Sequence, residues 1–574
     1  MRTAVRAAAF LLLFAVAPLC AAAPQVAHGR GGAVASAEEN AARAGIEILK
    51  KGGNATDAAV AVAFALAVTW PEAGNIGGGG FWISRDQRGR VLVVDYREVA
   101  PRAARRDLFT RPGRGGTVLS STEGPLASGV PGSVAGLALA HRRGGRLSWR
   151  AVVEPAVKLA RDGFLMTEVV SARIARPKHR ERLAADPETA AIFLPGGTPP
   201  LPGTLFRQSD LARTLAAIRD RGADGFYRGS VARRFEEGQK AIGGLITRGD
   251  LARYQAKIRR PVRFRFRGVE IWTTPAPSSG PVLAEMALLT RFVGLEKFSK
   301  RDTKSAHLLA EIEKRAFRDR NRYLGDPQFG RVREALFTEP SRLRAIAATI
   351  DPSRATASGR EGPLSDPGRE GGGFRSTTHF SVMDRFGSAV SVTTTLNDSF
   401  GNARVASGLG FLLNNEMDDF AAHPGQPNLS GLVQGQVNAI APGKRMLSSM
   451  CPSIAAIGGK NAYVWGTPGG STIPTTNLQV MLGVLLWGES LEAAISAPRF
   501  HQQDFPDKVQ VERGRFEPAW IEALRALGHT VAERAPDDDP IGRVHAIARR
   551  AEGAMTAVAD SRGGGVGLVV HEGP

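Results

Sequence analysis

The residues with the clearest chemical potential in this sequence are two threonines, Thr377 and Thr395. Thr377 opens an apolar run that turns at residues 384–387 and returns to Thr395, which predicts a β-hairpin. If the turn is centred on Phe386, the two threonines are equidistant from it, so we expect cross-strand neighbours whose hydroxyls meet. A chain cut before Thr377 would expose an α-amino group whose ordinary pKa, about 7.7 to 8.0, suits a general base for the threonine hydroxyl near neutral pH.

The same pattern has a plainer interpretation. Thr377 and Thr378 could simply begin an edge strand, where β-branched residues are common. The segment 358–373 before them is rich in glycine, serine and charge, as a flexible and cleavable segment would be. The choice between a nucleophile and a strand start therefore depends on the rest of the chain.

The first residues predict export from the cytoplasm. A positively charged start at residues 1–6, a short apolar stretch at 7–19 and small residues at 21–23 are typical of a secretory signal peptide, here residues 1–23. The apolar stretch is short for a membrane anchor, and so is the later apolar run at 58–68. Cys20 lacks the small preceding residue of a lipoprotein signal. We therefore expect a periplasmic or secreted protein without a transmembrane anchor.

The composition indicates a folded globular protein. Of 574 residues, 43% are hydrophobic and 23% are charged, which excludes wholesale disorder. Once the signal is removed, Cys451 is the remaining cysteine, so no intramolecular disulfide is possible. The formal net charge of +20 is compatible with a nucleic-acid or anionic partner, but the arginines are scattered and no nucleic-acid motif is present. A solvated cationic surface is the favoured interpretation, with no nucleic-acid partner.

Helices and strands are expected to form layers around the threonines. A capping box at residues 36–39 predicts a helix through Leu49, and residues 54–57 are expected to start a second, buried helix that includes 58–68. Strands are expected at 81–84 and 91–96, helices dominate 149–256 and 305–323, and strands dominate after 377. The glycines at 77–80 are followed by no lysine, so we expect close backbone packing beside a site and no phosphate loop. These elements predict a layered α+β protein.

Ordered motifs spread between about residues 32 and 567 resemble the γ-glutamyltranspeptidase family, a self-cleaving branch of the N-terminal nucleophile hydrolases. The matching segments are 52–59, 74–81, 95–98, 130–132, 277–280, 323–327, 377–382, 414–420, 447–450 and 468–471. The resemblance implies an α+β fold, the αββα four-layer sandwich of N-terminal nucleophile hydrolases, autoprocessed into two interleaved subunits. The large subunit would be residues 24–376 and the small, catalytic subunit residues 377–574.

The resemblance also implies an activity. Thr377 would attack the carbonyl of Ser376, cleave the chain there, and then carry a γ-glutamyl group as an ester. The donor would be glutathione or another γ-glutamyl compound, and the acceptor would be water, an amino acid or a peptide. The two products of one precursor would stay together as a heterodimer. No cofactor and no metal are expected.

The resemblance implies a role for each remaining site residue, and the side chain or backbone of that residue is chemically suited to it. Thr395 would orient Thr377, and Gly469 and Gly470, between a predicted strand at 462–465 and a helix starting near 473, would stabilise an oxyanion. The other residues would bind the donor: Arg97, Ser448 and Ser449 its α-carboxylate, and Asn397, Glu416 and Asp419 its α-ammonium. Singly, each could equally be a surface ion pair, a turn or a helix cap. We expect His379 to be a packed strand histidine without a catalytic role.

Two departures from the family pattern and two rival functions stay open. Glu416 stands where many bacterial members have glutamine, and Ser430 stands in a lid-like segment, 424–435, where some members have a gating tyrosine. One rival is a related acylase acting on glutaryl-cephalosporins or oxamate, against which Asp419 argues because a glutaryl group has no ammonium. The other is a secreted cationic binding protein that has lost catalysis. Retention of Thr377 and Thr395 argues against it.

Overall fold

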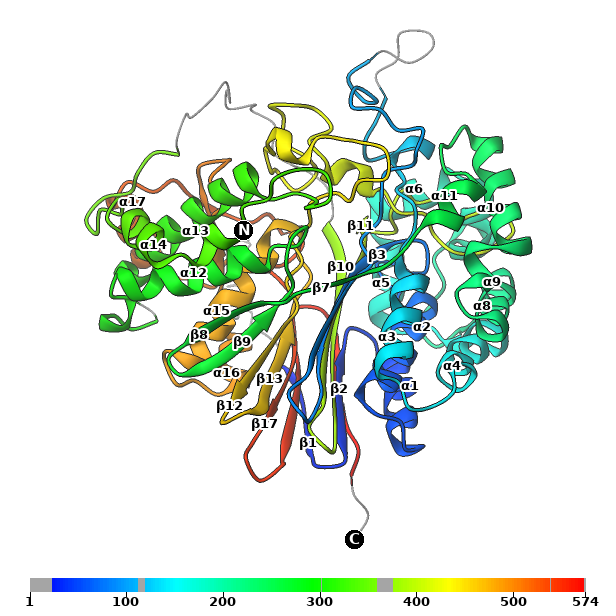
Figure 1. Cartoon of the computed structure of the whole chain (residues 1–574), viewed down its shortest axis with the longest axis horizontal. Helices are drawn as coiled ribbons and strands as arrows, with labels where there is room; N and C mark the ends of the chain where they lie inside the picture. The colour runs from blue at the N-terminus through cyan, green and yellow to red at the C-terminus, as the bar shows by residue number, and fades with distance from the viewer. Residues whose placement is uncertain (1–22, 112–118, 301, 359–374, 537, 572–574) are drawn as a thin grey trace, which may run out of the picture.

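A computed structural model describes residues 23–111, 119–300, 302–358, 375–536 and 538–571 of the chain. The predicted signal peptide, apart from its last residue, and nearly all of the glycine-rich segment before Ser376 lie outside these residues. Two seven-stranded sheets pack face to face at the centre, and a layer of helices covers the outer face of each (Figure 1). The α+β class and the αββα four-layer sandwich expected from the sequence are confirmed.

The first sheet contains the predicted hairpin. Its order is β19 (Val566–Val569), β2 (Gly32–Ser36), β10 (Arg375–Asp384), β11 (Ala389–Asp398), β3 (Gly79–Arg85), β4 (Val91–Asp95) and β7 (Lys257–Arg259). The second sheet has the order β1 (Gln25–Gly29), β18 (Met555–Ala559), β17 (His545–Arg549), β13 (Lys460–Gly466), β12 (Ser453–Ile457), β9 (Val269–Thr273) and β8 (Val262–Phe266). Two small sheets join β14 (Phe500–His501), β15 (Val509–Val511) and β16 (Val531–Glu533), and β5 (Phe164–Leu165) and β6 (Leu205–Phe206).

The helices divide into two outer layers (Figure 1). The layer beside the first sheet contains α1 (Glu39–Lys50), α2 (Ala55–Thr69), α3 (Ser133–Gly144), α4 (Trp149–Asp162), α5 (Glu168–Ala175), α6 (Pro177–Ala184), α7 (Pro187–Phe193), α8 (Ser209–Arg221), α9 (Asp224–Tyr227), α10 (Gly229–Ile242) and α11 (Arg248–Arg253). The layer beside the second sheet contains α12 (Gly280–Phe292), α13 (Thr303–Tyr323), α14 (Pro340–Ala347), α15 (Ile473–Leu485), α16 (Leu491–Ser496) and α17 (Pro518–Ala526). No helix in the described part of the chain is both long and apolar enough to cross a bilayer.

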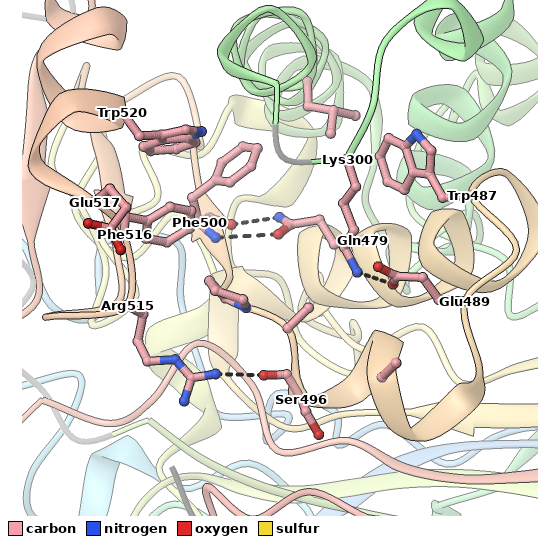
Figure 2. A pocket seen from close by; sticks show the side chains of 14 residues that line it. Lys300, Gln479, Trp487, Glu489, Ser496, Phe500, Arg515, Phe516, Glu517 and Trp520 are labelled. Carbon is pink, nitrogen blue, oxygen red and sulfur yellow. Dashed lines mark hydrogen bonds and ion pairs between the residues drawn. The ribbon is translucent and has the colours of Figure 1, made fainter. Parts of the chain in front are cut away.

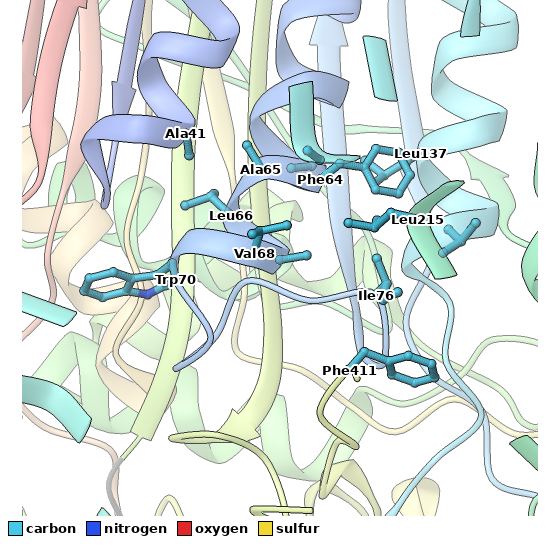
Figure 3. Packing of buried hydrophobic residues seen from close by; sticks show 14 of the residues in the cluster. Ala41, Phe64, Ala65, Leu66, Val68, Trp70, Ile76, Leu137, Leu215 and Phe411 are labelled. Atoms are coloured by element: carbon cyan, nitrogen blue, oxygen red, sulfur yellow. The ribbon is translucent and has the colours of Figure 1, made fainter. Parts of the chain in front are cut away.

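Helix α2 is the packing centre beneath the hairpin. All of its residues are buried, and it contacts α1, β10 and β11. Phe64, Leu66 and Val68 belong to the large cluster between this helix layer and the first sheet (Figure 3). Each fully buried side chain of this size contributes about 1.5 to 3 kcal/mol. The helix begins where the sequence predicts, because Asn54 and Asp57 form a capping box.

The start predicted for the preceding helix was wrong. Ser36 ends strand β2, which pairs with β10, and the N-cap is Glu38, whose carboxylate accepts the backbone N–H of Ala41 at 3.0 Å. Strand pairing overrides the local capping signal at Ser36, because a strand that pairs on both sides satisfies more backbone N–H and C=O groups than one helix cap does.

The β10–β11 hairpin has the predicted register, with Thr377 opposite Thr395. One residue further out the register shifts, so that Ser376 faces Asn397 and Leu396 is an extra, bulged residue. Asn397 has a positive φ of 80°, which is uncommon for a residue other than glycine. The bond between Ser376 and Thr377 therefore lies at an irregularity of an otherwise regular ladder.

The glycine run at 77–80 packs closely against this hairpin, as predicted. A Cβ on Gly78 would lie 2.1 Å from the carbonyl oxygen of Thr395, and one on Gly80 would lie 2.4 Å from that of Thr393. Any side chain at these two positions would collide with the β11 backbone. The glycines thus allow β3 to approach the strand that carries Thr395.

Candidate active site

The two threonines form a short hydrogen-bond relay that ends on a backbone carbonyl. The hydroxyl of Thr377 donates to the hydroxyl oxygen of Thr395 at 3.2 Å, and Thr395 donates in turn to the carbonyl oxygen of Ser376 at 2.8 Å. The backbone N–H of Asn397 donates to the Thr395 oxygen at 2.8 Å. Both threonines are buried. The Thr377 hydroxyl and the Ser376 carbonyl thus belong to adjacent residues, and Thr395 already donates to that carbonyl.

Gly469 and Gly470 lie between strand β13 and helix α15, as the sequence predicts. Their φ values are 136° and 57°, and a Cβ on Gly469 would lie 2.4 Å from the Thr472 hydroxyl oxygen. The turn that contains Gly470 contacts β10. Backbone N–H groups at the start of a helical turn lack intrahelical acceptors, so this turn can offer donors to an anion beside the hairpin.

Arg97 follows strand β4, at the same end of the strands as Thr377. Cross-strand pairs place residues of four neighbouring strands at one level of the sheet: Asp95 pairs with Phe81, Phe81 with Thr393 and Thr393 with His379. Arg97 and Thr377 are each two residues beyond this level, in the same direction. The Arg97 side chain is completely buried, so the interpretation of a surface ion pair is wrong. The hydroxyl of Tyr254 holds its backbone carbonyl at 2.8 Å.

Three carboxylates surround the Arg97 guanidinium. Glu416 is 2.7 Å from Nη1, Glu98 is 3.4 Å from Nη1, and Asp419 contacts Nη2. Burial raises the pKa of Glu416 well above its usual range and that of Glu98 to about 7, although Arg97 opposes both shifts. The structure therefore brings the predicted carboxylate-binding arginine and two predicted ammonium-binding acids together, and they pair with one another.

The segment with Glu416 and Asp419 is attached to the hairpin irregularity. The backbone N–H of Asn415 donates to the carbonyl of the bulged Leu396 at 3.0 Å, and the Asn397 amide donates to the carbonyl of Asn415 at 3.0 Å. The bulge thus fixes the position of both the Ser376–Thr377 bond and the acidic residues.

Ser448 and Ser449 are buried, and Met446, just before them in the same segment, contacts Arg97. The carbonyl of Met446 accepts from Arg97 Nε at 3.4 Å, the Ser448 hydroxyl accepts the Met450 N–H at 3.2 Å, and Ser449 accepts from Arg320 Nη2 at 3.2 Å. The predicted donor-binding residues are thus linked through Arg97. Glu416 and Asp419 contact Arg97 directly, and Ser448 and Ser449 lie just after Met446, which also contacts it. Asn397 is linked to Glu416 through Asn415.

The lid-like segment 424–435 contacts the same acidic turn. Asn428 donates to Asp419 at 3.0 Å, and the backbone N–H of Leu429 donates to Asp418 at 2.8 Å. The carbonyl of Ser430 accepts from Gln503 at 3.1 Å and from Ser471, next to Gly470, at 3.4 Å. The segment spans the distance between the acidic residues and the glycine turn.

Sequence reasoning missed three residues of this region. Glu98 is the third carboxylate on Arg97, and its signal was its position directly after Arg97 in a matched motif. Asn75 donates to the Thr395 carbonyl at 2.9 Å. Arg320 donates to Ser279 at 3.0 Å as well as to Ser449, and burial lowers its pKa to about 10, against the pull of Asp419. Arg320 gave no signal, because it is one of several arginines in a long amphipathic helix.

His379 does not take part in the relay. Its ring nitrogens bond to the hydroxyls of Thr393 at 2.9 Å and Ser381 at 3.1 Å, and burial holds its pKa well below the usual range. The expectation of a packed strand histidine is confirmed.

A large aromatic cavity elsewhere is separate from this site. It has a volume of about 630 Å³ and is lined by Phe500, Phe516 and Trp520, of which the last two stack with ring centroids 4.3 Å apart (Figure 2). An ion pair between Lys300 and Glu489 lies on another side. None of the predicted site residues lines this cavity.

Comparison with known proteins agrees with the geometry. Residues 41–570 match the γ-glutamyltranspeptidase family. The chain is 40% identical to the glutathione hydrolase proenzyme of Escherichia coli over 93% of this chain and 91% of that protein. It is also similar to the γ-glutamyltranspeptidase of Helicobacter pylori, with 36% identity and a TM-score of 0.54 over 58% of this chain and 96% of that one. A cephalosporin acylase of Bacillus halodurans shares the fold, with a TM-score of 0.84 at 24% identity, over 98% of this chain and all of that one.

Proposed function

The chain belongs to the γ-glutamyltranspeptidase family, and from this premise we propose that it cleaves its own bond between Ser376 and Thr377 and then transfers γ-glutamyl groups through Thr377. The observation that carries the proposal is the relay from Thr377 through Thr395 to the Ser376 carbonyl. It places a nucleophile, a hydroxyl partner and an electrophile in one hydrogen-bonded line.

Self-cleavage follows from the relay in two steps. The Thr377 oxygen attacks the Ser376 carbonyl carbon while the Thr395 hydroxyl stabilises the charge that develops on the carbonyl oxygen. The C–N bond then breaks, the Thr377 nitrogen takes a proton, and an ester links the two residues. Water hydrolyses that ester, so that residues 24–376 end in a carboxylate and residues 377–574 begin with a free amine. The β-bulge and the positive φ of Asn397 concentrate irregular backbone beside the bond that breaks.

The freed threonine then acts as an acyl carrier. Its α-amino group takes the hydroxyl proton, the oxygen attacks the γ-carbonyl of a donor such as glutathione, and the N–H groups of Gly469 and Gly470 hold the oxyanion. The leaving amine takes a proton as the C–N bond breaks. Water, an amino acid or a peptide amine then accepts the γ-glutamyl group and regenerates Thr377. Thr395 remains the group that orients the nucleophile.

Donor recognition uses the charge cluster around Arg97. A γ-glutamyl group carries an α-carboxylate and an α-ammonium, the same two charges that Arg97 and its acidic partners present to each other. The donor's carboxylate would pair with Arg97, Ser448 and Ser449. Its ammonium would replace the guanidinium as the partner of Glu416 and Asp419, with Asn397 as a further acceptor. After this exchange Arg97, Glu416 and Asp419 would each still have an oppositely charged partner.

Export to the periplasm or the medium, after removal of residues 1–23, belongs to the same proposal. The positively charged start, short apolar stretch and small residues support it. The two cleavage products would remain one heterodimer, because strands from both sides of the cut alternate in the first sheet.

The decisive experiment is product analysis with glutathione, with and without a dipeptide acceptor, on protein whose new amino terminus has been sequenced. We expect glutamate and cysteinylglycine in the first case, and in the second also the acceptor dipeptide carrying a γ-glutamyl group. A start at a residue other than Thr377 would contradict the cleavage proposal. Glutathione left intact by protein that starts at Thr377 would contradict the transferase proposal alone.

The glutaryl acylase alternative is tested by paired anilide substrates. A glutaryl anilide lacks the ammonium, so Glu416 and Asp419 would face each other without a counter-charge. Sites built around a polar group can reject the analogue lacking it by about 10⁴-fold, and we expect the γ-glutamyl anilide to react at least roughly a hundredfold faster. Equal rates would favour the acylase.

A further inference from the structure

A cleft of about 660 Å³ lies at the opposite end of strand β10 from Thr377. Four turns form it: the α1–α2 turn, the β3–β4 turn, the β10–β11 turn and the turn between α3 and α4. Thr377 and Asp384 are seven residues apart along β10, or roughly 23 Å at the rise of a β-strand. The cleft is therefore remote from the relay and from every residue assigned to the donor.

Arginine dominates the described lining of this cleft. The lining contains five arginines and two carboxylates: Arg85, Arg88, Arg90, Arg143 and Arg146, with Asp86 and Asp384. Arg88, Arg143 and Arg146 are exposed, and no carboxylate of the described chain lies within ion-pair distance of any of the three. Such guanidinium groups give the cleft a local positive charge.

Arg85 forms a buried part of the same lining. It is 6% exposed, and it donates to the Asn461 side-chain oxygen at 2.8 Å and to the Gly459 carbonyl at 3.0 Å. Its guanidinium lies 4.7 Å from the centre of the Trp272 ring. Within the described residues no carboxylate pairs with it, and its Nε has no hydrogen-bond partner. These contacts direct the guanidinium toward the second sheet, where burial lowers its pKa against the pull of Glu270 and Asp86. The positive charge open to the cleft therefore comes from the exposed Arg88, Arg143 and Arg146.

The two carboxylates of the lining, Asp86 and Asp384, already bind other groups of the protein. Asp86 holds Arg90 Nε at 2.6 Å and accepts the backbone N–H groups of Arg88 and Arg90, each at 2.9 Å. Asp384 accepts three backbone N–H groups, those of Ala55 at 3.1 Å, Phe386 at 3.0 Å and Ser388 at 2.9 Å. Asp86 thus neutralises Arg90, and Asp384 stabilises turns, which leaves an excess of positive charge.

We propose that this cleft is a binding site for a phosphate-bearing anion. Arginine forks match phosphate oxygens in a bidentate geometry, and several forks around one volume suit a group with more than one negative charge. The volume lies in the range of small-molecule sites, about 300 to 1,000 Å³. The same chemistry is offered by a soluble phosphate ester and by the headgroup of an anionic lipid. Phe386, which is half-exposed in the cleft lining, gives the second source an apolar contact.

Calorimetric titration of the processed protein with inorganic pyrophosphate at low salt tests the site. The variant Arg143→Ala/Arg146→Ala removes two exposed cleft arginines, and Arg180→Ala/Arg344→Ala removes two exposed arginines that do not line the cleft. We expect the dissociation constant to rise at least tenfold in the first variant and to stay within twofold in the second. Turnover of a γ-glutamyl anilide should be unchanged in both, which verifies folding.

A second arm distinguishes the two sources of phosphate. The same proteins are sedimented with phosphatidylcholine vesicles that contain or lack phosphatidic acid. Cosedimentation that requires phosphatidic acid and is lost in Arg143→Ala/Arg146→Ala identifies a lipid headgroup, whereas pyrophosphate binding without cosedimentation identifies a soluble ester. The proposal is overturned if neither probe binds in a way that depends on Arg143 and Arg146, or if the control variant loses as much binding.

Discussion

The two ends of strand β10 hold buried arginines in opposite electrostatic settings. At the Thr377 end, Arg97 is completely buried and contacts three carboxylates, Glu98, Glu416 and Asp419. At the Asp384 end, Arg85 is almost as deeply buried, and its hydrogen-bond partners among the described residues are neutral groups. One end carries surplus negative charge and the other surplus positive charge. This difference matches the two proposals, a zwitterionic donor at the Thr377 end and a phosphate-bearing anion at the Asp384 end.

The largest expected effect concerns the Thr377 end of β10, where the proposed chemistry takes place. Thr377→Ala should leave the chain uncut and abolish turnover, because it removes the nucleophile of both reactions. Thr378→Ala is the matched control, since its buried hydroxyl has no hydrogen-bond partner among the described residues, and it should still be cut. A denaturing gel and an anilide assay measure both outcomes. A cut Thr377→Ala chain would disprove the relay.

The second prediction compares the two buried arginines directly in the uncut Thr377→Ala background. Arg97→Gln leaves three carboxylates without their cation, so the free energy of unfolding should fall by about 3 to 5 kcal/mol, as for a broken buried ion pair. Arg85→Gln breaks no ion pair and keeps a donor, so its loss should be smaller by at least about 2 kcal/mol. Urea unfolding measures both. Equal losses would mean that the electrostatic contrast has no energetic consequence.

The third prediction concerns the acidic partners of Arg97 in the processed protein. Asp419→Asn should lower kcat/KM for γ-glutamyl donors by roughly 30- to 5,000-fold, equivalent to about 2 to 5 kcal/mol for a desolvated charge partner. Asp418→Asn is the neighbouring control and should have a smaller effect, since Asp418 binds Ser121 and Leu429 and not Arg97. Cleavage should survive in both variants. Unchanged kinetics in Asp419→Asn would remove Asp419 from donor binding.

The smallest expected effect is a change in how stability depends on pH. Burial raises the pKa of Glu98 to about 7, so the folded chain holds this proton more tightly than the unfolded chain does. Its contribution to stability is therefore full below about pH 4.5 and is lost as the pH rises toward 7. Glu98→Gln in the uncut Thr377→Ala background should flatten the decrease in Tm between pH 5 and pH 7.5. Superimposable Tm profiles would show that Glu98 is not protonated in the fold.

Local patterns predicted part of this structure, and long-range contacts account for the rest. The pairing of Thr377 with Thr395 follows from a hairpin turn centred on Phe386, and Asn54 with Asp57 marks the start of α2. The bulge at Leu396 left no sequence signal. The contact between Arg97 and Asp419 joins residues 322 positions apart, and no spacing rule reaches that far. The helix start predicted at Ser36 was wrong because pairing of β2 with β10 overrides a local cap.

The strand order of the first sheet has a consequence for how the mature protein ages. β10 lies between β2 and β11, and β3, β4 and β7 follow, so segments from both sides of the proposed cut alternate. Before cleavage, unfolding is a reversible event within one molecule. After cleavage, the unfolded state is two separate molecules, and recovery becomes a second-order encounter that dilution makes vanishingly slow. The cut would thus make unfolding effectively irreversible, and the lifetime of the cut protein would depend on its unfolding rate.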